Sequence, residues 1–309
     1  TANQTICYGE TPSTLSATAP TGGSGMFAYQ WQLSLDGGTN WTNVPSAGTL
    51  LTYSPPALTQ TTHYRLQQTD TYCSPSQSVY SNTVVITVHG QMQAGTATAN
   101  QTICYGEIPT AISATLPTGG SGSYTYQWQF STDGGTTYSN VATAGTSLTY
   151  APGALTQTTL YRLQQTDTYC TPHQVVNTNA VTITVHGQLQ AGTATADQTL
   201  CNGETPAILT STAPTGGSGT FTYQWQYSTN GGSSWANVAS GGTTLTYASA
   251  ALTTTTSFRL QQTDTYCSPD QVVYTNTVTV TVHSQLTAGT ATANQTICYG
   301  ETPSTLSAT

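Results

Sequence analysis

Cysteine is the residue type whose spacing in this chain most clearly indicates chemistry. Seven cysteines alternate at separations of 66 and 31 residues, at positions Cys7, Cys73, Cys104, Cys170, Cys201, Cys267 and Cys298. A thiol can form a disulfide, bind a metal ion or act as a nucleophile. A metal site would favour Cys-x-x-Cys pairs, and the sequence has none. The pattern therefore indicates structural disulfides and an oxidising environment.

The cysteine spacing belongs to a period that covers the whole sequence. The segment TANQTICYGETPSTLSAT at 1–18 returns unchanged at 292–309, and related segments begin at 98 and 195, so that the period is 97 residues. A unit of this size is a small domain, because solenoid repeats have only about 20 to 45 residues. We predict repeat 1 at 1–90 with its first strand partly missing, repeat 2 at 91–187, repeat 3 at 188–284, and the start of a fourth repeat at 285–309.

Composition excludes several classes of protein. Only 5% of the residues are charged and the net charge is -8, so the chain lacks the basic face that a nucleic-acid-binding protein needs. Hydrophobic residues make up 36%, enough for folded cores. No apolar run has the length of a membrane span, which is about 20 residues. No Ser-His-Asp pattern, phosphate loop or close carboxylate pair recurs, and we expect no enzymatic activity and no cofactor.

The elements that must position the cysteines are short β-strands. In YTYQWQFS at 124–131 the aromatic residues alternate with polar ones, and NTVTVTVH at 276–283 alternates in the same way. Turn signals such as PTGGSG separate these runs. We therefore predict an all-β fold of tandem immunoglobulin-like antiparallel β-sandwich domains, with one disulfide per domain. Each repeat has one core tryptophan on a central strand, namely Trp31, Trp128 and Trp225.

The disulfide pairing can follow two arrangements. Bridges between repeats, such as Cys104 to Cys267, would covalently chain neighbouring domains. Bridges between repeats are consistent with the sandwich. The first cysteine of a repeat follows the first strand and the second lies near the end of the sixth strand, so the two cysteines lie at opposite ends of the domain. We favour bridges within repeats, because these cysteines can pair without a neighbouring repeat. The favoured pairs are Cys7 with Cys73, Cys104 with Cys170, and Cys201 with Cys267.

A known family carries the same combination of motifs. The words QTICYGE, GGSGSYTYQWQFSTDGG, TYAPGALTQTTLYRL and NAVTITV, with a cysteine before the last, occur in this order in repeat 2. Together they resemble the Ig-like and PKD-like tandem repeats of very large Bacteroidota cell-surface adhesins, including those of the gliding machinery. The resemblance spans all three repeats. It implies an extracellular bacterial array, commonly exported by the type IX route, and no activity for a single repeat.

Several recurring polar and aromatic residues could form binding sites, although each has a structural interpretation. The arginines on the sixth strand are expected to pack over an aromatic ring or a carboxylate rather than grip a ligand. The acidic residues are too dispersed for a calcium loop. The histidines end the last strand and are expected to be solvated. The aromatic residues after the GG turn could stack on a sugar but are expected to pack on the sheet. These sets are Arg65, Arg162 and Arg259; Glu10, Glu107, Glu204, Asp70, Asp167 and Asp264; His89, His186 and His283; and Trp41, Tyr138 and Trp235.

Surface modification is a further possibility. Four Asn-x-Thr sequences are possible N-glycosylation sites, at Asn3, Asn40, Asn100 and Asn294. In a bacterial protein such sequences alone are weak support for a glycan.

Two functions are consistent with these features. The first is a structural extracellular fibre or adhesin stalk, a slice of a longer filament whose partners are neighbouring copies of itself. The second is a set of carbohydrate-binding modules in a surface adhesin or a secreted polysaccharide-degrading enzyme, with surface glycans as partners. Repeats that keep Trp, Arg and Cys but vary their loops favour the first. We expect secretion or display at the cell surface.

Overall fold

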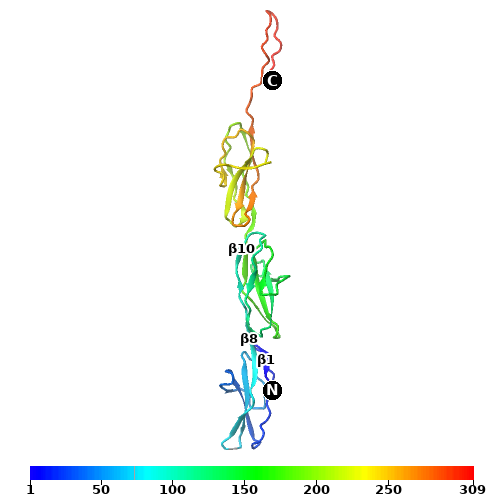
Figure 1. The fold of residues 1–309 in the computed structure, drawn as a ribbon, viewed down its shortest axis with the longest axis vertical. Coiled ribbons are helices and arrows are strands. Elements are labelled where there is room, and N and C mark those ends of the chain that lie inside the picture. Colours follow the sequence, from blue (N-terminus) through cyan, green and yellow to red (C-terminus); the bar gives the residue numbers. More distant parts are fainter. Residues whose placement is uncertain (73) are drawn as a thin grey trace. The chain divides into compact units, whose positions relative to one another are not determined.

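The structure is a computed structural model that describes residues 1–72 and 74–309. Within these residues the chain forms strands and turns and no helix. It divides into two compact units, Thr1–Val185 and His186–Thr309. The first unit holds repeats 1 and 2, coloured blue to green in Figure 1, and the second holds repeat 3 and the C-terminal segment.

The long strands of repeats 1 and 2 coincide with the alternating patterns, as in β13 (Tyr124–Ser131) and β16 (Thr159–Asp167). The strands of repeat 1 are β1 (Gln4–Cys7), β2 (Leu15–Ser16), β3 (Phe27–Ser34), β4 (Thr42–Asn43), β5 (Thr52–Tyr53), β6 (Thr62–Asp70), β7 (Gln77–Tyr80) and β8 (Val84–Gln93). Those of repeat 2 are β9 (Ala97–Thr98), β10 (Gln101–Ile103), β11 (Ile112–Ala114), β12 (Thr118–Gly120), β13 (Tyr124–Ser131), β14 (Ser139–Asn140), β15 (Thr149–Tyr150), β16 (Thr159–Asp167), β17 (Gln174–Asn177) and β18 (Val181–Val185).

Repeat 3 has the same succession of strands. They are β19 (Gly187–Gln190), β20 (Gln198–Cys201), β21 (Leu209–Thr210), β22 (Thr215–Gly217), β23 (Phe221–Ser228), β24 (Ala236–Asn237), β25 (Thr246–Tyr247), β26 (Thr256–Asp264), β27 (Gln271–Tyr274) and β28 (Val278–His283).

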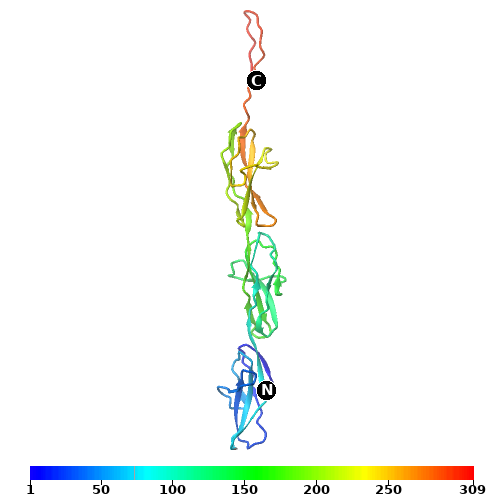
Figure 2. The same ribbon diagram turned by 60° about the vertical axis from the view of Figure 1, so that its left-hand side comes forward.

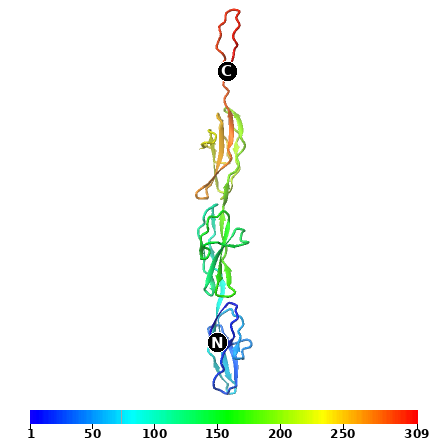
Figure 3. The ribbon, with the colours of Figure 1, turned by 90° about the vertical axis from the view of Figure 1, so that its right-hand side faces the viewer.

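Each repeat packs a large sheet against a small one, as the turned views in Figures 2 and 3 show. In repeat 1 the large sheet has the order β1-β8-β6-β3-β4, with β7 beside β6, and the small sheet is β2-β5. The same orders recur in repeat 2 (β10-β18-β16-β13-β14) and in repeat 3 (β20-β28-β26-β23-β24). Neighbouring strands of the large sheet are antiparallel except for the first, since β1 runs parallel to β8. This confirms the predicted immunoglobulin-like sandwich, with one parallel edge pair added.

The core of each repeat surrounds its tryptophan. Trp31, Trp128 and Trp225 are each at most 1% exposed. The indole Nε1–H of Trp31 donates to the Leu50 carbonyl at 3.0 Å, so this buried polar group is satisfied. Tyr53 stacks on Trp31 with 6.2 Å between ring centroids, and burial raises the pKa of Tyr64 beside it. Burying one such side chain stabilises a repeat by about 1.5–3 kcal/mol.

The C-terminal segment, residues 285–309, adopts the local structure of a repeat start without a core. Every residue in it is exposed. The side chain of Gln295 bonds the backbone of Ser304, as Gln4 bonds Ser13 in repeat 1. Figure 3 shows the segment, in red, outside the sandwich of repeat 3. These local hydrogen bonds form without the large sheet that surrounds them in a complete repeat.

Candidate functional site: the joint between repeats

The connection between repeats 1 and 2 is a continuous strand rather than a linker. The first half of β8 pairs with β6 and β1 inside repeat 1. Its second half pairs with β12 of repeat 2, where Gly90 lies opposite Gly120 and Gln93 lies opposite Thr118. β8 and β1 are labelled in Figure 1. A strand that belongs to both repeats restricts hinge motion, because bending would break ladder hydrogen bonds.

Side chains of repeat 2 hold the backbone at the end of β8 and just after it. The amide of Met92 donates to Gln174 Oε1 at 2.8 Å, and the amide of Gly95 donates to Gln165 Oε1 at 2.8 Å. Gln165 is itself fully buried, and Met92 is 2% exposed. The joint therefore has a small apolar and hydrogen-bonded core of its own.

A disulfide closes the same joint. Cys7 of repeat 1 is bonded to Cys170 of repeat 2, across 163 residues of sequence, with a Cα–Cα distance of 5.8 Å. In the chain-entropy model, closing a loop of this length stabilises the folded state by about 5 kcal/mol, because it lowers the conformational entropy of the unfolded chain. The covalent link thus joins two domains rather than stabilising one.

This bond corrects the predicted pairing within repeats. Because Cys7 pairs with Cys170, neither bonds the partner in its own repeat, and Cys201 is a free thiol in the described part of the chain. Cys104 and Cys267 are disulfide-bonded, but not to the cysteines of their own repeats. Cys73 lies outside the described residues. The wrong pairs are Cys7 with Cys73, Cys104 with Cys170, and Cys201 with Cys267.

Strand direction explains why the two cysteines of one repeat stay apart. β1 is parallel to β8, so that Cys7 lies opposite His89 at the end from which the chain leaves repeat 1. β6 is antiparallel to β8 and ends at Asp70, near the other end of the sandwich. A nine-residue strand is about 27 Å long. The exit end of repeat 1 and the opposite end of repeat 2 meet at the joint, which brings Cys7 to Cys170.

A buried carboxylate shapes the loop of repeat 2 that receives β8. Asp167 is fully buried and accepts hydrogen bonds from the Ser121 amide (2.5 Å), the Ser121 hydroxyl (2.7 Å) and the Tyr169 amide (3.0 Å). Burial raises the pKa of Asp167, but these hydrogen bonds outweigh it and hold the pKa below its ordinary value. Gly120 has a φ of +63°, and a Cβ there would lie 2.5 Å from Asp167 Oδ2, so this turn requires glycine.

His89 lies against this loop. Its ring meets the ring of Tyr169 edge to face, with 5.0 Å between centroids and 79° between planes. His89 also lowers the pKa of Asp167 through its charge. The histidine is half-buried rather than solvated as the sequence analysis expected.

The second unit repeats these contacts around its own N-terminal strand. β19 pairs with β22, and Leu189 is 4% exposed. The Gly192 amide donates to Gln262 Oε1 at 2.8 Å. The rings of His186 and Tyr266 meet at 5.0 Å and 82°. The arrangement is therefore a property of the repeat sequence and not of one position in the chain.

The arginines form cation–π stacks on the outer face of the large sheet. Arg65 lies between Trp41 and Tyr80, with its Cζ 4.2 Å and 3.9 Å from the ring centroids, and its Nε donates to Gln32 Oε1 at 2.9 Å. Arg259 lies in the same way between Trp235 and Tyr274. In repeat 2, Arg162 covers Tyr138 at 3.8 Å, and Asn177 replaces the second aromatic residue. The packing role of the arginines thus holds, with Tyr80 and Tyr274 as partners that the sequence analysis did not identify.

The remaining predicted residues serve local structure. Glu10 accepts the Cys7 amide at 2.8 Å, and Asp70 binds the Ser24 hydroxyl at 2.6 Å. Among residues 1–72 and 74–309, no group of three or more His, Cys, Asp or Glu side chains is placed to hold a metal ion. Asn3 and Asn40 are exposed, and Oδ1 of Asn3 accepts the Val85 amide at 2.9 Å. Oδ1 of Asn100 accepts the Thr182 amide at 2.8 Å, and Asn294 is exposed in the C-terminal segment.

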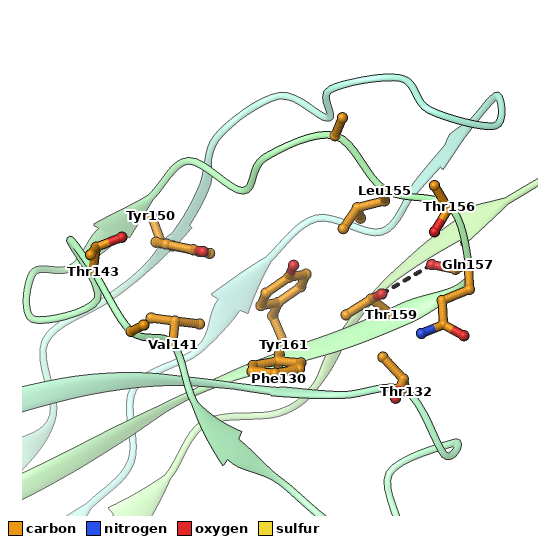
Figure 4. A pocket seen from close by; sticks show the side chains of 12 residues that line it. Phe130, Thr132, Val141, Thr143, Tyr150, Leu155, Thr156, Gln157, Thr159 and Tyr161 are labelled. Carbon is orange, nitrogen blue, oxygen red and sulfur yellow. Dashed lines mark hydrogen bonds between the residues drawn. The ribbon is translucent and has the colours of Figure 1, made fainter.

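A pocket opens between the two sheets of repeat 2. Figure 4 shows the rings of Phe130, Tyr150 and Tyr161 around it, with the Thr159 hydroxyl bonded to the Gln157 carbonyl at 3.0 Å. Its volume is about 360 Å³, and a related pocket of about 300 Å³ occurs in repeat 3. The lining offers apolar contact and neutral hydrogen-bonding groups, without a carboxylate, imidazole or thiol for acid–base or nucleophilic chemistry.

Most of the residues that build the joint were not predicted from the sequence. These are Met92, Gly120, Gln165, Tyr169 and Gln174. One signal was present, because positions 92, 189 and 286 hold Met, Leu and Leu within an otherwise polar linker. An apolar residue that recurs in a polar connection indicates a buried contact.

Comparisons with known proteins place the chain in a family. A model described as a domain of unknown function (DUF8696) matches residues 1–90, 93–187 and 190–284, and the chain belongs to this family. No curated protein matches the sequence. No helix in the described residues is both long and apolar enough to cross a membrane.

Solved structures with some similarity are also tandem domains. Sidekick-1 immunoglobulin domains 1–4 match at 12% identity and a TM-score of 0.34, over 95% of this chain and 74% of that one. Drosophila OTK extracellular domains 3–5 match at 13% identity and a TM-score of 0.32, over 92% and 95%. Domains A168–A170 of titin match at 12% identity and a TM-score of 0.31, over 91% and 96%.

Proposed function

We propose that this chain is a load-bearing extracellular stalk of tandem immunoglobulin-like domains, whose function is to transmit force along connected repeats. The observation that carries the proposal is the joint, in which β8 is shared by two sheets and Cys7 is bonded to Cys170. A chain of independent binding modules would need neither feature, since flexible linkers suffice to tether such modules.

The disulfide supports an extracellular location. Disulfides persist in secreted and surface proteins and are rare where glutathione keeps thiols reduced. The resemblance to repeats of Bacteroidota surface adhesins agrees with this location. We propose the cell surface or a surface filament as the site of action.

Force spectroscopy on single molecules tests the load-bearing role. The variant to pull carries serine at Cys104, Cys201, Cys267 and Cys298, so that Cys7–Cys170 is the bond under test. This bond closes a loop of 163 residues. The fully stretched oxidised chain should therefore be about 570 Å shorter than the same chain with the added substitution Cys7→Ser. Equal lengths would mean that the joint does not carry load through the disulfide, and would contradict the proposal.

Carbohydrate binding is the second candidate, favoured by the arginine–aromatic stacks. Tyr80 is 49% exposed and Tyr274 43% exposed, which leaves aromatic surface for a sugar. A glycan array probed with the oxidised chain distinguishes the two functions. A stalk should give no signal. Binding that is lost in the double variant Trp41→Ala and Trp235→Ala, with an unchanged unfolding midpoint, would favour the carbohydrate-binding module.

A further inference from the structure

Repeat 3 contains two Asn-Gly pairs, Asn202–Gly203 and Asn230–Gly231, and the rest of the sequence contains none. An asparagine before glycine readily loses its side-chain amide, because glycine has no side chain to keep its backbone nitrogen from the carbonyl carbon of the asparagine side chain. In a folded chain this nitrogen must also be free to lose its proton. The two pairs should therefore react differently if their glycine amides have different hydrogen-bond partners.

The two glycine amides have different environments. The Gly203 amide donates to the Leu252 carbonyl at 2.8 Å. In the part of the chain that the structure describes, no group accepts a hydrogen bond from the Gly231 amide, and both Asn230 and Gly231 are exposed. The hydrogen bond holds the Gly203 proton and fixes the position of its nitrogen, so it must break before that nitrogen can react. Water and hydroxide reach the Gly231 amide directly.

The surroundings of Asn230 also polarise the carbon that the nitrogen attacks. Oδ1 of Asn230 accepts the Ser228 hydroxyl at 2.8 Å and the Ser234 amide at 3.0 Å. These donors stabilise the negative charge that develops on this oxygen when a nucleophile adds to Cγ, as the donors of an oxyanion hole do. Nδ2 of Asn230 donates to the Ser234 hydroxyl at 2.7 Å, which fixes the orientation of the amide. The side chain of Asn202 instead donates to the Thr253 carbonyl at 3.2 Å.

Repeats 1 and 2 have an aspartate at the position of Asn230, namely Asp36 and Asp133. The Asp36 carboxylate accepts the Asn40 amide at 2.9 Å, and the Asp133 carboxylate accepts the Thr137 amide at 3.0 Å. Hydrogen bonds, first that of the Asn40 amide, lower the pKa of Asp36 to about 2. Those of Thr137 hold the pKa of Asp133 below its ordinary value. The turn therefore favours a carboxylate, and repeat 3 has the corresponding amide in its place.

We propose that Asn230 deamidates spontaneously in the folded protein while Asn202 is protected, and that the aspartate formed stabilises its turn as Asp36 and Asp133 do. The Gly231 nitrogen loses its proton to hydroxide and attacks Cγ of Asn230. The Cγ–Nδ2 bond breaks, and the nitrogen takes up a proton from water and leaves as ammonia. Water then opens the cyclic imide, at Cγ to give aspartate or at the main-chain carbonyl carbon to give isoaspartate. The modification adds one negative charge to repeat 3, and it does not rest on the stalk function.

Peptide mapping by mass spectrometry tests the site. The folded chain is incubated at pH 8, digested with pepsin at intervals, and the deamidated fraction of each Asn-Gly peptide is measured. Asn230 should react about tenfold faster than Asn202, the factor expected if one hydrogen bond must first break. In urea the two sites should react at the same rate, because the hydrogen bond to Leu252 is lost. Equal rates in the folded chain, an unreactive Asn230, or a difference that persists in urea would overturn the proposal.

The variant Asn230→Asp tests the effect of the product. It should raise the unfolding temperature of repeat 3 at pH 7 by about 2 °C. A carboxylate whose folded pKa lies below 3.8 stabilises fully above that value, so the rise should shrink as the pH falls toward 2. Asn202→Asp is the matched control and should give no rise, since in the described residues no backbone amide donates to the Asn202 side chain. A lower unfolding temperature in Asn230→Asp, or the same change in both variants, would contradict the stabilising role.

Discussion

The linker after repeat 1 and the linker after repeat 3 have related sequences and opposite environments. HGQMQAGTA at 89–97 is packed into a joint, and HSQLTAGTA at 283–291 is exposed. The difference lies in the neighbouring repeat, because only the first linker is succeeded by a complete sandwich within its unit. The pattern that favours burial is therefore local, whereas burial itself depends on the next repeat.

Contacts between repeats therefore stabilise the joint. The groups that hold the linker, Gln165 and Gln174, belong to repeat 2, as does the bonded Cys170. A substitution in the linker should accordingly be costly after repeat 1 and nearly neutral after repeat 3. Four substitutions can test this difference, in order of decreasing effect.

The largest effect is expected from the disulfide. Replacing both Cys7 and Cys170 by serine should lower the free energy of unfolding of the first unit by about 5 kcal/mol, because the unfolded chain regains a loop of 163 residues. Cys298→Ser should change stability by less than about 0.5 kcal/mol. Urea denaturation followed by tryptophan fluorescence measures both.

Peptide mapping of the unmodified chain should find Cys7 with Cys170 and, at the same separation, Cys104 with Cys267; a bond between Cys104 and Cys170 would contradict the register.

Met92 should carry the apolar part of the joint. Met92→Ala should cost about 3 kcal/mol, because it leaves a cavity in a packed contact. Leu286→Ala, at the equivalent exposed position, should cost about 0 kcal/mol. Thermal unfolding measured by calorimetry compares the two, and similar costs would mean that the two linkers have similar environments in solution.

Asp167 should make the joint sensitive to acid. Its folded pKa lies below the ordinary value of 3.8, so its stabilising contribution is complete above that value and is lost as the pH falls through the folded pKa. Asp167→Asn should cost about 2 kcal/mol at pH 7 and should remove this part of the pH dependence. Stability measured from pH 7 down to pH 2 tests the sign. Glu301→Gln in the exposed segment is the control, and a matching change in its profile would argue against a role specific to the joint.

The smallest effect is expected from the aromatic contact. His89→Ala should cost about 1 kcal/mol, the usual contribution of an edge-to-face ring pair. His283→Ala, in the exposed equivalent, should have no measurable effect. Hydrogen exchange of the amides of β12 gives a local readout, and faster exchange is expected only in His89→Ala.

Much of the fold was predictable because the information is local. The strands around Trp128 and the turn glycines follow from alternation and from turn chemistry, which depend on residues close in sequence. The alternating side chains of β16 lie as predicted, with Tyr161 and Leu163 buried. The partner rings of Arg65 and Arg259 were not predictable, since β7 and β27 approach them only across the folded sheet.

The sequence by itself determined the period, the sandwich class and the tryptophan cores, because these depend on residue patterns within 97 residues. It also placed the two cysteines of a repeat at opposite ends of the sandwich, but the pairing within repeats that we favoured from the sequence was wrong. Only the tertiary structure decided the disulfide partner. A bond requires two sulfur atoms to meet, and the parallel run of β1 along β8 brings Cys7 to the end of repeat 1 where Cys170 of the next repeat lies.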